Sequence, residues 1–162
     1  MSPLTAKVVQ APARFDRVDR VKRAVGQQVL AGDDRFWILG DPLIIQVGDQ
    51  RIEVPVGFTT DGASVPGWAK RLTGWDAWTD PQRWAGVAHD WLYSQPGVSK
   101  SYADKVFRAL LASQGASAVK RDLMYAAVVA GGWLAYRRNQ ARGPRIFVDS
   151  RSRSHDGPLP PV

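Results

Sequence analysis

The chain has 162 residues, 44% of them hydrophobic and 23% charged, a composition typical of a globular protein with one sizeable core. It contains no cysteine, which excludes disulfide bonds and metal sites built from thiolates. The net charge of +7 is unevenly spread, because six arginines and only two aspartates follow residue 136.

Neither the N-terminal stretch nor the most apolar run has the pattern of a signal peptide or a membrane-spanning helix. The N-terminal stretch MSPLTAKVVQAPARFD lacks a basic segment followed by an apolar one, so we expect no secretory signal peptide. The longest apolar run, LMYAAVVAGGWLAY, has 14 residues, too few to span a bilayer as a straight helix. We interpret it as a buried helix that is weakened at Gly131 and Gly132.

Residues 1–35 are expected to form an N-terminal extension that contains an amphipathic helix. Within residues 13–30, apolar side chains recur at intervals of three and four: Phe15, Val18, Val21, Val25 and Val29. Charged residues fall between them, and AGDD at 31–34 ends the pattern.

Residues 36–60 are expected to form a small antiparallel sheet. Two stretches, 38–46 and 51–58, are rich in β-branched and aromatic residues, as strands are. VGDQR between them is typical of a hairpin turn, with Gly48 and Asp49 at the tip. Pro55 indicates an edge position for the second strand.

Residues 80–136 are expected to form a three-helix unit. The first helix begins near Asp80-Pro81 and ends before the QPGV break at 95–98. The second runs from Ser101 to Gly115, and the third from Ser117 through the apolar run to Tyr136. The fold class is therefore α+β: an N-terminal helix and a small antiparallel hairpin or sheet, then three helices. Residues 36–136 form its single domain.

Residues 137–162 are interpreted as a basic, flexible C-terminal tail. Arginines among Gly, Ser and Pro residues could contact nucleic acid or an anionic lipid surface. The alternative is a solvated end, or one that orders only against a partner subunit.

AGVAHDWLY, residues 85–93, contains the one histidine outside the tail. On a helix, His89 and Tyr93 are four residues apart and share a face. His89 precedes the turn at 96–97 by about as many residues as Asp104 follows it, so antiparallel helices would bring Asp104 to His89 or Tyr93. Asp61, on the loop leaving the sheet, could converge on Asp90.

These residue types permit hydrolytic chemistry. A carboxylate that holds one ring nitrogen of His89 fixes its tautomer, and the other nitrogen can take a proton from water. Asp90 and Asp61 would supply hard oxygen ligands, which favour Ca²⁺ or Mg²⁺. The alternative is structural: a buried His-Asp-Tyr network that joins the helices.

Four stretches in this order, GFTTDGASVP, AHDWLYS, SYADKVFRALL and RDLMYAAV, resemble a family of small tailed-bacteriophage and prophage proteins described as a domain of unknown function. The resemblance covers residues 36–136 and implies a virion protein, such as a tail or baseplate component. Its partners would be other virion proteins, and it would lie in the phage particle, or in the host cytoplasm before assembly.

HDWLY and the later ADKVF are also similar to the catalytic helix pair of phospholipase A2, particularly the form in parvovirus capsids. This resemblance implies that His89 is the general base, that Asp90 binds Ca²⁺, and that Asp104 and Tyr93 orient the histidine. The sequence departs from that family in two ways. It lacks the glycine-rich calcium loop, which residues 60–64 would have to replace, and the 15 residues from His89 to Asp104 are a short interval.

Three functions therefore stand as hypotheses. The first is a metal-assisted hydrolase acting on lipid or cell-wall bonds of the bacterial envelope, with His89 and both helix aspartates in an open cleft and Asp61 near. The second is a structural virion protein with the same cluster as a buried network. The third is a nucleic-acid-binding protein that uses the basic tail. Exposure of His89 separates the first two, because a general base must reach its substrate.

Overall fold

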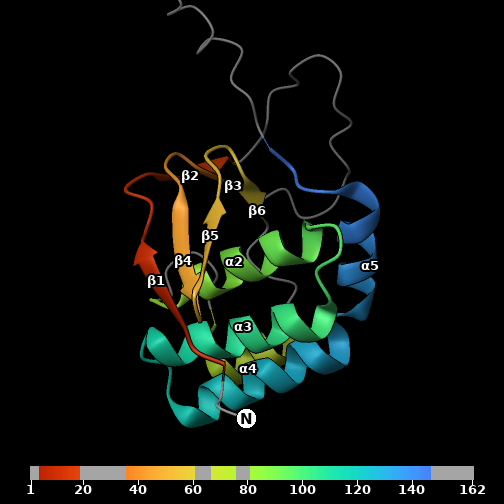
Figure 1. Ribbon diagram of the computed structural model, residues 1–162. Helices are drawn as coiled ribbons and strands as arrows, with labels where there is room; N and C mark the ends of the chain where they lie inside the picture. The colour runs from red at the N-terminus through yellow and green to blue at the C-terminus, as the bar shows by residue number, and fades with distance from the viewer. Residues whose placement is uncertain (1–3, 19–35, 61–66, 76–80, 147–162) are drawn as a thin grey trace, which may run out of the picture.

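The structure is a computed structural model, and it describes residues 4–18, 36–60, 67–75 and 81–146. These residues form two small sheets and five helices, with the sheets first in the chain (Figure 1). The α+β prediction, a small antiparallel sheet followed by packed helices, is confirmed. No helix in the described ranges combines the length and apolar character needed to cross a membrane.

The first sheet has the strand order β1-β4-β5 and is antiparallel throughout. Its strands are β1 (Ala6–Gln10), β4 (Leu43–Val47) and β5 (Gln50–Val54). The predicted hairpin is β4 and β5, joined at Gly48, whose φ of 53° suits a glycine in a tight turn. Strand β5 is an edge strand, as predicted, and Pro55 directly follows it. Proline has no backbone N–H, and at the edge of a sheet no neighbouring strand needs that donor.

The second sheet has the order β2-β3-β6 and is also antiparallel. It comprises β2 (Phe15–Val18), β3 (Phe36–Leu39) and β6 (Thr59–Thr60). The C-terminal end of the described chain joins it, because Thr59 N donates to Arg145 O at 2.8 Å and Phe58 bridges Ile146.

The helix predicted over residues 13–30 does not begin where the sequence pattern indicated. Residues 15–18 form β2 and pair with β3 instead, and the Phe15 ring stacks on Trp37 with centroids 4.7 Å apart. Pairing with β3, which is distant in the sequence, therefore determines the backbone conformation of residues 15–18. The remainder of the predicted helix lies outside the described residues. Strand β1, which the sequence pattern did not indicate, falls within the predicted extension and pairs with β4.

The helices begin and end close to their predicted positions. Helix α2 is Arg83–Ser94 and α3 is Lys100–Ser113, near the first two predicted helices, whereas α1, Gly67–Thr73, was not predicted. The predicted third helix is divided at Gly132 into α4 (Ala118–Gly131) and α5 (Trp133–Arg142). Helix α5 therefore continues into the stretch predicted to be tail.

Helix α5 packs against α2 and α4, at the side of the molecule opposite the β1-β4-β5 sheet (Figure 1). Tyr136 OH donates to Val98 O at 2.8 Å, and the Gln140 side-chain amide donates to Tyr93 O and Gln95 O, each at 2.8 Å. These bonds satisfy main-chain carbonyls at the α2 C-terminus and in the turn after it.

One apolar core joins the sheets to the helices. Strand β4 contributes Leu43, Ile45 and Val47, and α3 contributes residues at helical spacing, including Phe107 and Leu110. The same buried face of α3 also carries Asp104, so a carboxylate is placed inside the core.

We predict that Leu110→Ala lowers the free energy of unfolding by about 2–5 kcal/mol, because it leaves a cavity beneath a fully buried side chain. Leu72→Ala, on the exposed side of α1, is the matched control and should change it by less than about 0.5 kcal/mol. Urea unfolding followed by circular dichroism measures both, and equal effects would contradict this account of the core.

Candidate functional site

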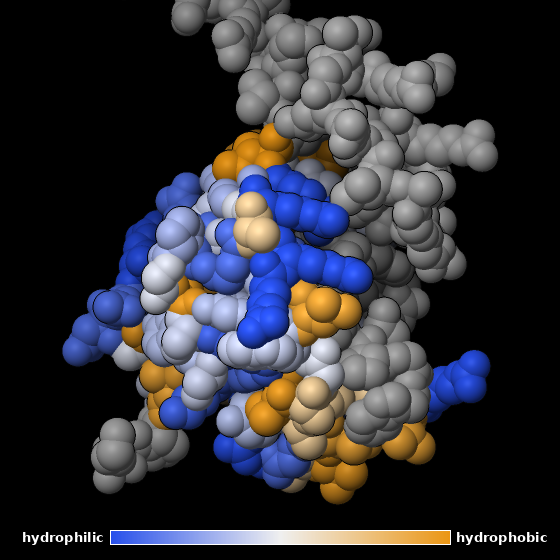
Figure 2. All heavy atoms as spheres, turned by 90° about the vertical axis from the view of Figure 1, so that its right-hand side faces the viewer, coloured by the Kyte–Doolittle hydropathy of each residue, from blue (hydrophilic) through white to orange (hydrophobic). Residues whose placement is uncertain are grey.

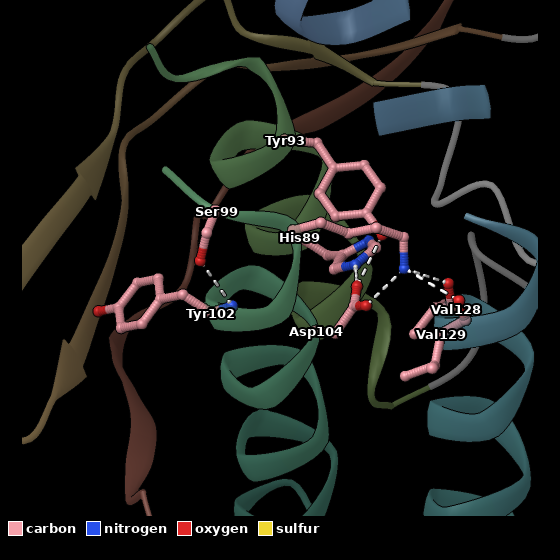
Figure 3. A network of polar contacts seen from close by, with 8 residues as sticks. His89, Tyr93, Ser99, Tyr102, Asp104, Val128 and Val129 are labelled. Atoms are coloured by element: carbon pink, nitrogen blue, oxygen red, sulfur yellow. Dashed lines mark hydrogen bonds and ion pairs between the residues drawn. The ribbon is translucent and has the colours of Figure 1, made fainter. Parts of the chain in front are cut away.

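Helices α2 and α3 bring His89, Tyr93 and Asp104 into contact (Figure 3). His89 Nε2 lies 2.8 Å from Asp104 Oδ1, and Tyr93 OH donates to the same oxygen at 2.6 Å. The imidazole and phenol rings lie with their centroids 4.0 Å apart. The predicted convergence of Asp104 on both side chains is confirmed.

The second carboxylate oxygen of Asp104 accepts a hydrogen bond from Lys100 Nζ at 2.6 Å. The same ammonium donates to Val128 O at 2.8 Å and Val129 O at 3.2 Å, at the C-terminal end of α4. A cation is favourable there, because the last carbonyls of a helix carry partial negative charge. Lys100 thus joins the cluster to α4 and supplies a positive charge beside Asp104.

Lys100 was not singled out from the sequence. The local signal was present, since Lys100 and Asp104 are four residues apart and face the same side of a helix. Its contacts with α4, 28 and 29 residues away, have no local signal.

The cluster is buried: His89 is 1% exposed and Asp104 2%, and Asp90 beside them is also buried. The open cleft that the hydrolase hypothesis predicted around His89 is therefore not found among the described residues, and this burial is what the structural hypothesis predicted. Burial lowers the pKa of His89 below its ordinary 6.5, although the bond to Asp104 opposes this. Burial would raise the pKa of Asp104, but hydrogen bonds from His89, Lys100 and Tyr93 outweigh it and hold the pKa below 3.8. Burial, then the bond to Asp104, raises the pKa of Tyr93.

These shifts define one charge state at neutral pH. Asp104 is an anion, and His89 and Tyr93 are neutral. Lys100 forms an ion pair with Asp104. A neutral His89 that donates Nε2–H to Asp104 carries its lone pair on Nδ1. Nδ1 is buried and has no hydrogen-bond partner among the described residues. A neutral imidazole with a fixed tautomer and an uncommitted lone pair can accept a proton.

Asp90 lies next to His89 on α2 and is turned toward the second sheet. Its Oδ2 accepts a hydrogen bond from Thr60 Oγ1 at 2.5 Å, which fixes the end of β6 beside it. Asp61, the next residue along the chain, lies outside the described residues. Within the described ranges, no group of three or more His, Asp or Glu side chains could hold a metal ion. Asp90 alone therefore does not make a cation site.

A family model described as "Protein of unknown function (DUF1353)" matches residues 37–128, more than half of the chain. The chain belongs to this family. Neither a curated protein nor a solved structure matches it. Of the two predicted resemblances, the domain of unknown function is confirmed, whereas its phage origin and the likeness to phospholipase A2 stay predictions. His89, Asp90, Tyr93, Lys100 and Asp104 all fall inside the DUF1353 match.

Gly132, just outside the DUF1353 match, is fitted closely against the cluster. A Cβ added to Gly132 would come within 2.6 Å of Tyr93 OH and 2.5 Å of Val128 O. The backbone conformation at Gly132 is ordinary right-handed helical, so the requirement is one of space. The glycine that divides α4 from α5 thereby lets the Tyr93 hydroxyl reach Asp104.

We predict that Gly132→Ala lowers the free energy of unfolding by about 1–3 kcal/mol through overpacking. Tyr93→Phe removes the hydroxyl that the new methyl group would strike. The two changes should therefore be non-additive, with the double variant less destabilised than the sum of the single ones. The clash of the new methyl group with Val128 O remains in the double variant, so the relief is partial. Urea unfolding of the four proteins measures it, and strict additivity would show that Val128 O, and not the Tyr93 hydroxyl, limits the space at Gly132.

Stability should also depend on pH through His89. Because the folded-state pKa lies below 6.5, the unfolded chain binds a proton that the folded protein does not as pH falls below 6.5. The free energy of unfolding should therefore decrease from about pH 6.5 downward, by at most about 1.4 kcal/mol per pH unit. The contribution of Asp104, whose pKa is also lowered, is lost only below pH 3.8.

Urea unfolding between pH 7.5 and 5 tests this dependence, with His89→Gln as the reference because glutamine does not titrate. The slope below pH 6.5 should be shallower in His89→Gln. Identical slopes in the two proteins would show that His89 is not the group responsible.

Proposed function

We propose that this chain is a hydrolase in which His89 is the general base. The observation that carries the proposal is the arrangement of the imidazole: Nε2 is held by Asp104, and Nδ1 has no partner within the described residues. If His89 were purely structural, leaving its buried Nδ1 acceptor without a hydrogen bond would lower the free energy of unfolding by about 1–3 kcal/mol. A water molecule at Nδ1 would satisfy it and stand where a general base needs it.

The reaction that fits this arrangement is hydrolysis of an ester. The oxygen of a water molecule attacks the carbonyl carbon while Nδ1 of His89 takes the proton. The resulting imidazolium is stabilised by Asp104 and then gives the proton to the leaving alkoxide, so the products are an acid and an alcohol. Tyr93 and Lys100 hold the carboxylate in place throughout, because both donate to it.

The proposed cofactor is Ca²⁺, or Mg²⁺, held by Asp90 together with Asp61. Such an ion polarises a carbonyl oxygen when bound. The described residues do not by themselves provide its ligand set, so no step above passes through it. The position of Asp90 supports the assignment, because its bond to Thr60 brings the start of the 60–64 segment to the carboxylate.

The proposed setting is a virion component of a tailed phage or prophage, with a lipid of the bacterial envelope as substrate. This part of the proposal is supported by the motif resemblance rather than by the geometry. The proposed location is the phage particle, or the host cytoplasm before assembly, and the proposed partners are other virion proteins.

A second candidate function is favoured by a different observation. His89 is 1% exposed, and the three donors to Asp104 form a compact buried network that joins α2, α3 and α4. In a structural virion protein this network would fix the helix packing and no substrate would need to reach His89. The hydrolase candidate predicts turnover of a substrate, and the structural candidate predicts none.

We predict that the wild-type protein hydrolyses phosphatidylglycerol in the presence of Ca²⁺ and that His89→Gln lowers kcat by about 10²–10⁴-fold, the usual contribution of a general base. Glutamine can still donate to Asp104, so the variant should fold. Asp122→Asn, which removes an exposed carboxylate that pairs with Arg108 and Arg121, is the control and should keep full activity. A wild-type protein without turnover on envelope lipids would favour the structural candidate.

Metal binding is tested separately by titration calorimetry. Wild type and Asp122→Asn should bind Ca²⁺ or Mg²⁺, and Asp90→Asn should not. Equal heats for Asp90→Asn and the wild type would remove Asp90 from the metal site, whatever the activity assay gives.

A further inference from the structure

Helix α5 and the end of α4 carry apolar side chains that nothing in the described part of the chain covers. Val129 is 48% exposed, Trp133 52% and Leu134 60%. Val129 and Trp133 are four residues apart across the Gly132 break, so they lie near one another. Figure 2 shows the side of the molecule that includes α5, where hydrophobic and strongly hydrophilic side chains adjoin.

The same face is positively charged. Helix α5, residues 133–142, contains three arginines and no acidic residue, and all three are exposed. Arg137 and Arg138 follow Trp133 and Leu134 by four residues and so lie on the same side of the helix. The Arg137 guanidinium lies 5.2 Å from the centre of the Trp133 ring. Long arginine side chains can extend past apolar neighbours, so that the charge meets an anionic layer while the apolar atoms lie deeper.

We propose that this face, Val129, Trp133, Leu134 and the α5 arginines, docks on an anionic lipid surface. A tryptophan beside aliphatic side chains, bordered by arginines, matches a membrane interface: the apolar groups enter the boundary of the acyl chains and the guanidinium groups contact lipid phosphates. The inference goes beyond the proposed reaction, because docking requires no turnover.

Two other occupants fit the face less well. A second copy of the chain packed symmetrically on it would bring the arginines of one α5 close to those of the other, which is repulsive. A nucleic acid would match the charge and could stack a base on Trp133, but it would leave the exposed aliphatic side chains of Val129 and Leu134 without an apolar partner. An anionic membrane uses both the charge and the aliphatic surface.

The docking face is joined directly to the buried cluster. Lys100, which donates to Asp104, also holds the carbonyls of Val128 and Val129 on the inner side of the face. Gly132 contacts the Tyr93 hydroxyl from the same segment. Docking would therefore place the lipid surface against the helix ends that hold the proposed catalytic cluster.

Co-sedimentation of the full chain with vesicles tests the proposal. We expect binding to vesicles of equal parts phosphatidylglycerol and phosphatidylcholine, weakened by added salt, and little binding to phosphatidylcholine alone. Trp133→Ala with Leu134→Ala, and separately Arg137→Gln with Arg138→Gln, should each weaken binding by roughly tenfold or more. Val119→Ala, at the far end of α4, and Arg51→Gln, on β5, are the matched exposed controls and should bind as the wild type does.

Several outcomes would overturn the proposal: no binding of the wild type to either vesicle, equal binding of the face variants and controls, or a loss of dimerisation or oligonucleotide binding in the face variants in place of lipid binding. The His89→Gln variant separates this inference from the proposed reaction. It should bind vesicles as the wild type does while losing turnover. If the wild type binds vesicles but shows no turnover, the hydrolase proposal is overturned and the docking face is retained.

Discussion

The described structure depends on one buried carboxylate. Asp104 lies on the core face of α3, where an unpaired charge would be strongly unfavourable. It is stable there because His89, Tyr93 and Lys100 all donate to it, and these donors come from the α2 face opposite and from its own helix. Removing one donor would leave the charge undercompensated, so the positions of α2 and α3 are coupled to the chemistry of a single side chain.

The neighbouring elements are arranged around that carboxylate. Lys100 extends the network to the last carbonyls of α4, and Gly132 gives the Tyr93 hydroxyl the space it needs. On the other side of α2, Thr60 holds Asp90 toward the second sheet. The buried His-Asp-Tyr unit is thus supported from both sheet and helices, as a preorganised general base requires. The same support would make a rigid structural network, and the uncommitted lone pair of His89 Nδ1 is the feature that favours catalysis.

Local sequence patterns predicted the parts of this structure that have local causes. The β4–β5 hairpin follows from its turn residues, and the contact of His89 with Asp104 follows from their nearly equal distances from one turn. The start of α4 follows from its capping residue Ser117, whereas α2 and α3 begin at Arg83 and Lys100 and not at the predicted residues. Strand β2 was not predicted, because the spacing of Phe15 and Val18 fits a helix as well as it fits a strand. Only the pairing of these residues with β3 determines that they form a strand. Lys100 and Gly132 acquire their roles from partners distant in the chain, which no local pattern contains.

The bonds from α5 to the α2–α3 turn have a consequence for where the domain ends. The segment by which the family is recognised stops at residue 128, yet Tyr136 and Gln140 satisfy three carbonyls inside it, and β1 covers an edge of β4 before it begins. A fragment cut to residues 37–128 would expose a bare sheet edge and leave helix-end carbonyls without donors. A truncated chain for expression or deletion analysis should therefore keep residues Ala6 to Ile146, which include these contacts.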